Sequence, residues 1–320
     1  MRHDTDLKGL VMSAANDSQP ATGPYLAALR EVLAREYPEW GSGALSVAGA
    51  GLNFLVCRAE TARFGALALR TPWVATLVND TDGVLDARRL LRQETALAEY
   101  VRARGIPAPA SRALHLGDDG VDFLATDFVV GDGSPPAPHA FGALLRAIHA
   151  LPPPDFALIE GGDAPPHERI AARLGERAVA LARLTGEAFP LPTCTEMATM
   201  LAPRAAARAL LHMDARPANL FTRRGAIVAI IDWGNALVGD PALEVARIAE
   251  SGNLDDAFLA GYGGDPLGAL PPAIQSLYRL DTVVMLALVF LAEAPDPAAA
   301  RAMLARTRTL LAALQTSAAS

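Results

Sequence analysis

Residues 210–248 read LLHMDARPANLFTRRGAIVAIIDWGNALVGDPALEVARI and contain the most informative pattern in the 320-residue chain. The triplet HMD at 212–214, followed by Asn219, fits the pattern H-x-D-x-x-x-x-N, and DWG at 232–234 fits D-x-G. Either motif alone is weak, because such aspartates often cap helices or close turns. Their order along the chain, with GDP at 239–241 after them, indicates a functional loop region.

Phosphoryl transfer is a reaction that needs these side chains. The protein has to place an attacking hydroxyl in line and neutralise the charge of a triphosphate with a divalent cation. A carboxylate can orient the hydroxyl and accept its proton, and the hard Mg²⁺ ion prefers oxygen ligands from a carboxylate and an amide. We therefore predict that Asp214 is the catalytic base and that Asn219 and Asp232 are magnesium ligands.

Hydrophobic patterning around these motifs predicts a mixed architecture. Apolar runs on either side of TRRG at 222–225 indicate a short hairpin. Residues 45–70 contain the short β-like runs LSVAGAG, NFLVCRA and ALALR, which indicate an antiparallel meander, and residues 90–101 show helical spacing. Two further strands joined by GDDG are expected within 110–130, and from 141 onward the chain is mainly helical.

The chain resembles the aminoglycoside phosphotransferase and choline kinase superfamily, whose hallmark is H-G-D-x-x-x-x-N followed by I-D-W and G-D-P. This chain reads HMDARPAN, IDWGNALVGDP and LEVA, and weaker similarities extend from about Leu45 to Tyr278. The resemblance implies an α+β, bilobal protein-kinase-like fold, whose N-terminal lobe is mainly antiparallel sheet with one key helix and whose C-terminal lobe is mainly helical. We expect a polar leader at 1–22, a nucleotide-binding lobe at 23–130 and a catalytic and substrate-binding lobe at 131–320.

The resemblance also implies a set of nucleotide contacts. A glycine turn would lie over the phosphates, since glycine permits close backbone approach, and an arginine–glutamate pair would grip them. The segment at 126–130 would form the hinge that hydrogen-bonds a purine. Without the family, the structural interpretation of these pieces is favoured: a common turn, a strand-end charge, a helix-surface acid and a half-buried strand. The expected nucleotide-binding residues are Gly49, Gly51, Asn53, Arg70, Glu94, Asp127, Phe128 and Val130.

Four other polar residues receive structural or open interpretations. His149 is expected to be a packing residue, because a lone helical histidine is more often structural than catalytic. By resemblance, His212 supports the catalytic loop through hydrogen bonds, and Asp240 braces it. Arg216 fits a phosphate contact and a solvent-facing position equally well.

The chain departs from the family pattern at positions that bear on the acceptor. Met213 replaces the usual glycine and would narrow the space near the acceptor, while Glu244 stands where the family often has aspartate. Acidic side chains in the second half would suit a polyamine-like substrate if they line a cleft, although acids on helices more often form a solvated face. These acidic residues are Glu250, Asp255, Asp256, Asp265 and Asp281.

Composition narrows the classes of protein. Hydrophobic residues make up 51% of the chain and charged residues 20%, which predicts a globular fold. A formal charge of −7 without basic clusters argues against nucleic acid as a partner. Cys57 and Cys194 lack metal-type spacing. The amino terminus lacks the continuous apolar core of a secretory signal and the apolar stretch 282–292 is short for a membrane span, so we expect a soluble cytoplasmic protein.

The predicted activity is transfer of the γ-phosphate of ATP or GTP, with Mg²⁺, to a hydroxyl of a small molecule. The expected acceptor is an antibiotic of aminoglycoside, nucleoside or peptide type, with resistance as the consequence, or a related metabolite. One alternative is a non-catalytic nucleotide- or ligand-binding member of the same fold, and another is a kinase of an amino alcohol or sugar. A protein kinase is disfavoured, because an A-P-E segment is not evident and only a short stretch separates DWG from GDP.

Overall fold

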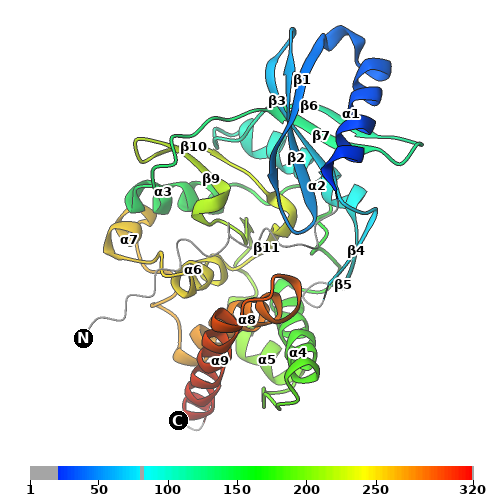
Figure 1. Ribbon diagram of the computed structural model, residues 1–320. Helices are drawn as coiled ribbons and strands as arrows, with labels where there is room; N and C mark the ends of the chain where they lie inside the picture. Colours follow the sequence, from blue (N-terminus) through cyan, green and yellow to red (C-terminus); the bar gives the residue numbers. More distant parts are fainter. Residues whose placement is uncertain (1–20, 80–82, 319–320) are drawn as a thin grey trace.

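The computed structural model describes residues 21–79 and 83–318, which form a sheet lobe and a mainly helical lobe (Figure 1). In the sheet lobe, five antiparallel strands run in the order β1-β2-β3-β7-β6. The elements of this lobe are α1 (Thr22–Glu36), β1 (Ser42–Ala50), β2 (Phe54–Thr61), β3 (Gly65–Pro72), β4 (Thr76–Asn79), β5 (Gly83–Asp86), α2 (Ala87–Arg102), β6 (Ser111–Leu116) and β7 (Asp122–Asp127).

Alternating side chains on the strands let helices pack on both faces of the sheet. On β2, Leu55, Cys57 and Ala59 are buried together with the apolar side of α1. Phe54 belongs to a separate cluster with Leu91 of α2. Helix α2 is thereby held against the sheet, on the side from which it also reaches the loops of the helical lobe.

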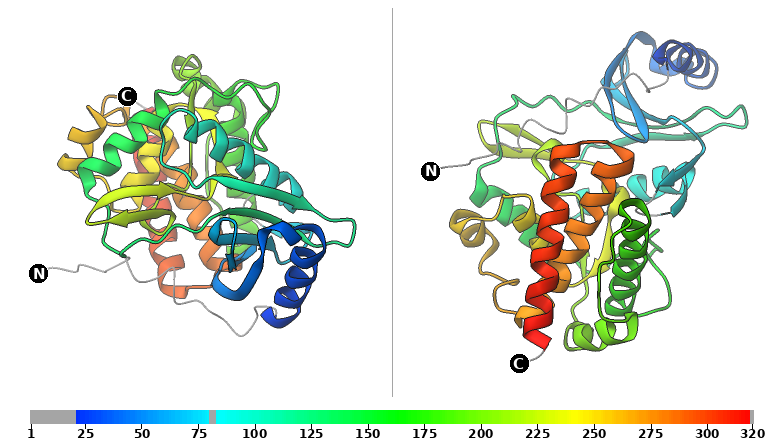
Figure 2. Two further views of the ribbon diagram at one scale, coloured as in Figure 1. Left: turned by 90° about the horizontal axis from the view of Figure 1, so that it is seen from above. Right: turned by 60° about the horizontal axis from the view of Figure 1, so that its bottom comes forward.

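The helical lobe lies below the sheet lobe in Figure 1, and Figure 2 shows α4, α8 and α9 side by side. Its elements are α3 (Pro138–His149), α4 (Pro166–Thr185), α5 (Cys194–Leu201), β8 (Ala209–Leu211), β9 (Leu220–Arg223), β10 (Ala226–Ile230), β11 (Leu237–Gly239), α6 (Pro241–Glu250), α7 (Asp256–Tyr262), α8 (Pro272–Leu288) and α9 (Pro297–Ala318). Two short antiparallel pairs, β9 with β10 and β8 with β11, frame the HMD and DWG motifs.

The mixed fold class and the hairpin around TRRG are confirmed. Strands β9 and β10 are joined at Arg224 and Gly225, whose φ angles of 52° and 78° are those of a tight hairpin turn. The strand expected to continue to Val130 ends at Asp127, which lies opposite Leu67 of β3; beyond it, the nitrogen of Phe128 makes one more hydrogen bond, to the carbonyl of Ala66. The hairpin of β4 and β5 was not predicted, and the leader expected at 1–22 lies almost entirely outside the described residues.

The apolar helix near the carboxyl end differs from expectation in length. The stretch 282–292 looked too short to span a membrane, but the helical run Pro272–Glu293 is long and apolar enough to do so. It is the one such helix among the described residues, and 67% of its most apolar window is buried. Side chains of α8, including Leu280 and Val283, are buried in the main cluster of the helical lobe, so α8 is a core helix.

Helices α3 and α7 approach closely because each contributes a glycine to the contact. A side chain on Gly142 would clash with the backbone carbonyl of Phe258 and come within 2.8 Å of the nitrogen of Tyr262. A side chain on Gly261 would clash with the backbone of His139. The contact matters for the site because α3 carries His149 and α7 carries Tyr262, which bond to each other.

We predict that Gly142→Ala lowers the free energy of unfolding by about 2 kcal/mol, because the added methyl group forces the two backbones apart. Chemical denaturation measures this change. Ala147→Ser, on the exposed side of the same helix, is the matched control and should change stability by less than about 0.5 kcal/mol. Equal effects of the two substitutions would show that the contact between α3 and α7 is not tight.

Candidate active site

The catalytic-loop backbone turns sharply at Met213, which has a φ angle of 61°. Glycine adopts this left-handed conformation without cost, whereas other residues are strained by roughly 1–3 kcal/mol. The Met213 side chain is 2% exposed and belongs to the core cluster of the helical lobe, with Leu211. The expectation that Met213 narrows the acceptor space is therefore wrong, because its side chain packs into the core.

Glu244 of α6 holds this strained turn in place. Its Oε2 accepts a hydrogen bond from the backbone nitrogen of His212 at 2.9 Å, and its Oε1 accepts one from Met213 at 2.7 Å. His149 Nε2 donates to Oε2 at 2.8 Å, and Tyr262 donates to His149 Nδ1 at 2.8 Å. Burial alone would raise the pKa of Glu244, but the hydrogen bonds and charge around it, chiefly from His149, lower it. The packing role expected for His149 is confirmed.

His212 is fully buried and uses both ring nitrogens within the loop. Nδ1 accepts from the backbone nitrogen of Asp214 at 3.1 Å, and Nε2 donates to the carbonyl of Ile231 at 3.0 Å. These two contacts select one neutral tautomer and link the HMD loop to the strand end before DWG. His212 supports the loop as expected, and its ring has no remaining nitrogen to act as a base.

Asp214, the expected catalytic base, is the last residue of the HMD triplet, and its side chain is 12% exposed. Its Oδ2 accepts from Asn219 Nδ2 at 2.7 Å and from Arg216 Nε at 3.2 Å. Its Oδ1 accepts from Arg247 Nη2 at 3.1 Å. Arg216, which the sequence left open, therefore binds the carboxylate, and Arg247 of α6 is a partner that the sequence did not reveal.

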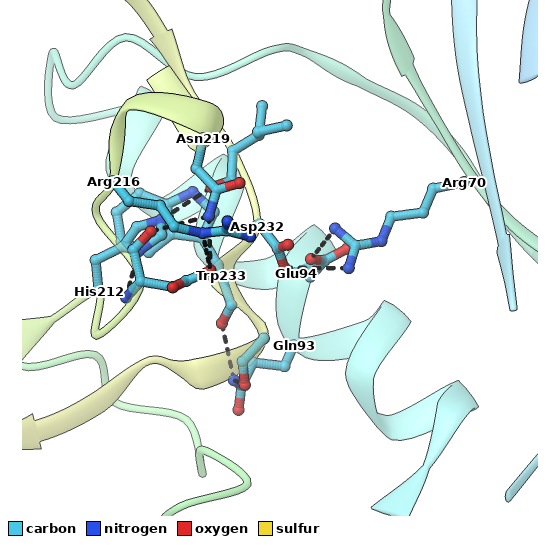
Figure 3. Close-up of polar contacts among 11 residues, drawn as sticks. Arg70, Gln93, Glu94, His212, Arg216, Asn219, Asp232 and Trp233 are labelled. Atoms are coloured by element: carbon cyan, nitrogen blue, oxygen red, sulfur yellow. Dashed lines mark hydrogen bonds and ion pairs between the residues drawn. The ribbon is translucent and has the colours of Figure 1, made fainter. Parts of the chain in front are cut away.

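Arg70 joins the sheet lobe to the DWG loop (Figure 3). Its Nη1 lies 2.7 Å from Glu94 Oε1 on α2, its Nη2 lies 3.1 Å from Asp232 Oδ1, and its guanidinium stacks over the ring of Phe54. Burial raises the pKa of Glu94 to about 8, with a contribution from Asp232 and opposition from Arg70. For Asp232, Arg70 outweighs burial and lowers the pKa. The structure thus brings together Arg70, Glu94 and Asp232.

The DWG loop is fixed by its own backbone and by α2. Asp232 has a φ angle of 69°, a left-handed conformation that is unusual for aspartate. Gln93 Nε2 donates to the carbonyls of Trp233 and Gly234 at 3.0 and 2.9 Å, and its Oε1 accepts from the backbone nitrogen of Ile159 (Figure 3). One buried amide therefore ties the helix that carries Glu94 to the loop that carries Asp232.

The predicted glycine turn connects β1 and β2. The nitrogen of Gly51 donates to the Phe54 carbonyl at 2.8 Å, and Trp73 holds the turn through bonds to the carbonyls of Gly51 and Asn53. A side chain on Gly49 would meet nothing within 4 Å, so no neighbouring atom of the described chain requires glycine there. Phe54, the first residue of β2 after the turn, stacks on Arg70. The turn therefore lies beside the charged cluster of Arg70, Glu94 and Asp232.

Several groups of the predicted hinge already form hydrogen bonds within the protein. The carboxylate of Asp127 forms two bonds with Arg112, at 2.6 and 2.9 Å, at the surface. The nitrogen of Phe128 donates to a carbonyl of β3 at 3.0 Å, and the carbonyl of Val130 accepts from Arg223 at 3.0 Å. The backbone nitrogen of Asp127 also donates, to the carbonyl of Ala110 at 3.0 Å, so the hinge nitrogens beyond Phe128 are the better candidates for a purine contact.

The acidic residues of the second half are mostly engaged in structural contacts. Glu250 binds Arg279 and Arg306, and Asp281 binds Arg173 through two bonds and Arg177 through a third. Asp255 and Asp265 accept from backbone nitrogens at the ends of α7 and the following turn. Asp240 likewise caps α6 and binds Arg204 and Tyr278, as a bracing residue would. These carboxylates do not form an acidic cleft.

The donor set fits a magnesium ion that a nucleotide brings with it. Among the residues that the structure describes, no group of three or more His, Cys, Asp or Glu is placed to hold a metal. Asp232 offers a carboxylate that already holds the cation of Arg70, and Asn219 gives its amide hydrogens to Asp214, which leaves its carbonyl oxygen. Mg²⁺ commonly takes one or two protein oxygens and completes its shell with phosphates and water.

A sheet lobe over a helical lobe, with two aspartates and an asparagine on adjoining loops, defines a kinase-like phosphotransferase. A family model described as "Phosphotransferase enzyme family" matches residues 45–276. The chain belongs to this family, and it is a small-molecule phosphotransferase that acts on hydroxyl groups. No curated protein sequence matches it.

Solved structures share the fold at low identity. A putative aminoglycoside phosphotransferase from Ralstonia eutropha JMP134 is 16% identical, with a TM-score of 0.60 over 90% of this chain and 98% of that chain. A thermostable mutant of aminoglycoside phosphotransferase APH(4)-Ia, in ternary complex with ADP and hygromycin B, is 13% identical, with a TM-score of 0.59 over 88% and 98%. A putative fructosamine-3-kinase from Haemophilus somnus 129PT is 13% identical, with a TM-score of 0.64 over 88% and 96%.

The residues that sequence reasoning missed lie next to ones that it found. Gln93 precedes Glu94 on α2, and its burial depends on the DWG loop, which is 140 residues away. Arg247 follows Glu244 by three positions, and helical spacing puts such residues on the same face. Because Glu244 was recognised as part of the motif, this spacing is the signal that could have identified Arg247.

We predict that Glu244→Gln lowers the free energy of unfolding by about 2 kcal/mol or more, because the charged acceptor of two backbone nitrogens and of His149 is lost. Chemical denaturation measures the change. Glu187→Gln, which removes one exposed partner of Arg308, is the control and should cost less than about 0.5 kcal/mol. A loss at Glu244 as small as that at Glu187 would contradict the bracing role.

Proposed function

We propose that the protein transfers the γ-phosphoryl group of ATP or GTP to a hydroxyl of a small molecule, with Asp214 as the catalytic base. The observation that carries this proposal is the position of Asp214, which is bonded to Asn219 and is close enough to Arg70, the partner of Asp232, for its charge to help raise the pKa of Arg70. Carboxylates at such a site suit phosphoryl transfer, which depends mainly on positioning and charge neutralisation.

The residues have separate roles in this proposal. A carboxylate oxygen of Asp214 accepts the proton of the acceptor's hydroxyl group while the hydroxyl oxygen forms a bond to the γ-phosphorus. The bond between the γ-phosphorus and the oxygen that bridges it to the β-phosphate breaks, and the nucleoside diphosphate leaves. Arg70 binds phosphate oxygens while Glu94 keeps its guanidinium in place. Asp232 and Asn219 would hold Mg²⁺, which supplies charge neutralisation on the phosphates. Gly49, Gly51 and Asn53 would cover the phosphates, and the segment through Phe128 and Val130 would bind the base.

The proposed acceptors are an antibiotic of aminoglycoside, nucleoside or peptide type and related metabolites, and the proposed location is the cytoplasm, where nucleoside triphosphates are available. An antibiotic acceptor would make the protein a resistance factor. A non-catalytic binding role is less well supported. The position of Asp214 is fixed by a strained backbone turn at Met213, which the buried carboxylate of Glu244 holds in place. Such cost is typical of functional sites.

We predict that Asp214→Asn lowers turnover by about 10²- to 10⁴-fold and changes nucleotide affinity by less than about threefold, because the base acts on the transition state. Release of ADP gives the turnover, and calorimetric titration gives the affinity. Arg308→Gln, at an exposed ion pair with Glu187, serves as the control. Equal loss of turnover and of nucleotide binding would count against the catalytic role of Asp214.

We also predict that Asp232→Ala weakens nucleotide binding at least tenfold with Mg²⁺ and much less with EDTA, because a ligand of the metal is lost. Titration of ATP in both conditions measures the difference. If the ratio of the two affinities matches that of the wild-type protein, Asp232 does not bind the metal.

A further inference from the structure

Arg247 is hydrogen-bonded to Oδ1 of Asp214, the carboxylate oxygen that Asn219 does not contact. Its Nη2 lies 3.1 Å from Oδ1, whereas Asn219 and Arg216 both bind Oδ2. Arg247 comes from α6 of the helical lobe. Burial raises the pKa of Asp281 on α8, and the charges of Arg173, Arg177 and, to a smaller extent, Arg247 outweigh burial and lower it. Arg247 thus lies between the catalytic carboxylate and the helices of the helical lobe.

This contact determines what the acceptor meets at Asp214. The acceptor hydroxyl needs a carboxylate oxygen of Asp214 within hydrogen-bond reach. Oδ2 already accepts from Asn219 and Arg216, whereas Oδ1 accepts from Arg247 alone and keeps a lone pair for a second donor. Oδ1 is therefore the oxygen that can receive the hydroxyl, and an acceptor that reaches it lies beside the guanidinium of Arg247.

The surroundings determine which partner suits Arg247. Asp281 is 1% exposed and already accepts from Arg173 and Arg177, so it offers Arg247 little more. A cationic group on the acceptor would add positive charge beside Arg216 and Arg247. An anionic group would be attracted to these two guanidinium groups, and a guanidinium matches carboxylate and phosphate geometry.

We propose that Arg247 binds a carboxylate or phosphate group of the acceptor, and that this contact positions the acceptor's hydroxyl at Oδ1 of Asp214. The proposal rests on the proposed phosphotransferase function and names its substrate class: a hydroxyl compound that carries an anionic group. Arg247 is 19% exposed at its side chain, so an acceptor can reach it. It selects against polycationic acceptors and thereby excludes the aminoglycosides from the acceptors proposed above; within the described part of the chain, the acids of the helical lobe are mostly engaged in structural contacts.

The donor's own phosphates are the other source of the same chemistry. Arg70 lies beside Asp232 and Glu94, between the sheet lobe and the DWG loop, and is the guanidinium placed for the donor. Arg247 instead lies on α6, and its charge helps to lower the pKa of Asp281 on α8. If Arg247 binds the acceptor, substitutions of Arg247 change the preference among acceptors and leave the affinity for the donor unchanged. If Arg247 binds the donor's phosphates, the same substitutions weaken donor binding and leave the acceptor preference unchanged.

The test uses full-length protein, MgATP and acceptors matched in carbon skeleton: glucose, glucosamine, gluconate and glucose 6-phosphate, then glycerol, 3-amino-1,2-propanediol, glycerate and glycerol 3-phosphate, with kanamycin as a polycation. Phosphorylated products are measured by mass spectrometry, and kcat and KM by ADP release. Hydrolysis of ATP without acceptor is recorded in parallel. Arg247→Gln and Arg247→Lys are compared with the wild type, and Arg308→Gln at the exposed pair is the control.

The wild type is expected to use at least one anionic member with a kcat/KM at least tenfold above its neutral and cationic counterparts. Arg247→Gln should reduce that preference about 10- to 100-fold, mainly through the acceptor's KM, with the KM for ATP unchanged. Arg247→Lys should retain part of it. Hydrolysis of ATP without use of any anionic acceptor, a preference for kanamycin or neutral compounds, or a changed KM for ATP alone would overturn the proposal. Absence of both hydrolysis and transfer would instead overturn the proposed function.

Discussion

The site depends on holding three carboxyl groups, those of Glu94, Asp214 and Asp232, around Arg70, with Glu94 and Asp214 buried and Asp232 partly exposed. Burial and the nearby Asp232 raise the pKa of Glu94 to about 8, and a buried carboxylate needs a cation or several hydrogen-bond donors. Arg70 serves both Glu94 and Asp232, while Arg247 and Arg216 serve Asp214. The arginines thus stand where magnesium, phosphates and the acceptor's polar groups would later compete for the same oxygens.

Secondary structure from distant parts of the sequence delivers these charges. Strand β3 carries Arg70, helix α2 carries Glu94, and the loops framed by the two short strand pairs carry Asp214 and Asp232. Buried polar groups fix the loops from behind: Glu244 holds the backbone before Asp214, and Gln93 holds the backbone after Asp232. Because backbone and side chains are anchored together, binding is expected to move mainly the arginine side chains.

Much of this arrangement was predictable from local sequence, and the rest was not. Motif order singled out Asp214, Asn219 and Asp232, which the structure places on adjoining loops, and short apolar runs between turn residues predicted the sheet and the hairpin around TRRG. The direction of Met213 was mispredicted because the motif suggests a position next to the acceptor, whereas the backbone turn points the side chain into the core. The partners of Asp281, over 100 residues away, could not be read from the chain, because ion pairing depends on how α4 packs against α8.

The fold and family establish a phosphotransferase, and in the proposed mechanism Arg70 binds the donor while Arg247 binds the acceptor. The most direct measurement is phosphorus NMR of the wild-type protein with Mg²⁺, ATP or GTP and a mixture of hydroxyl compounds that includes anionic ones. The account predicts that the γ-phosphate signal declines while a phosphomonoester signal grows in proportion. An unchanged γ signal, or growth of inorganic phosphate alone, would contradict it.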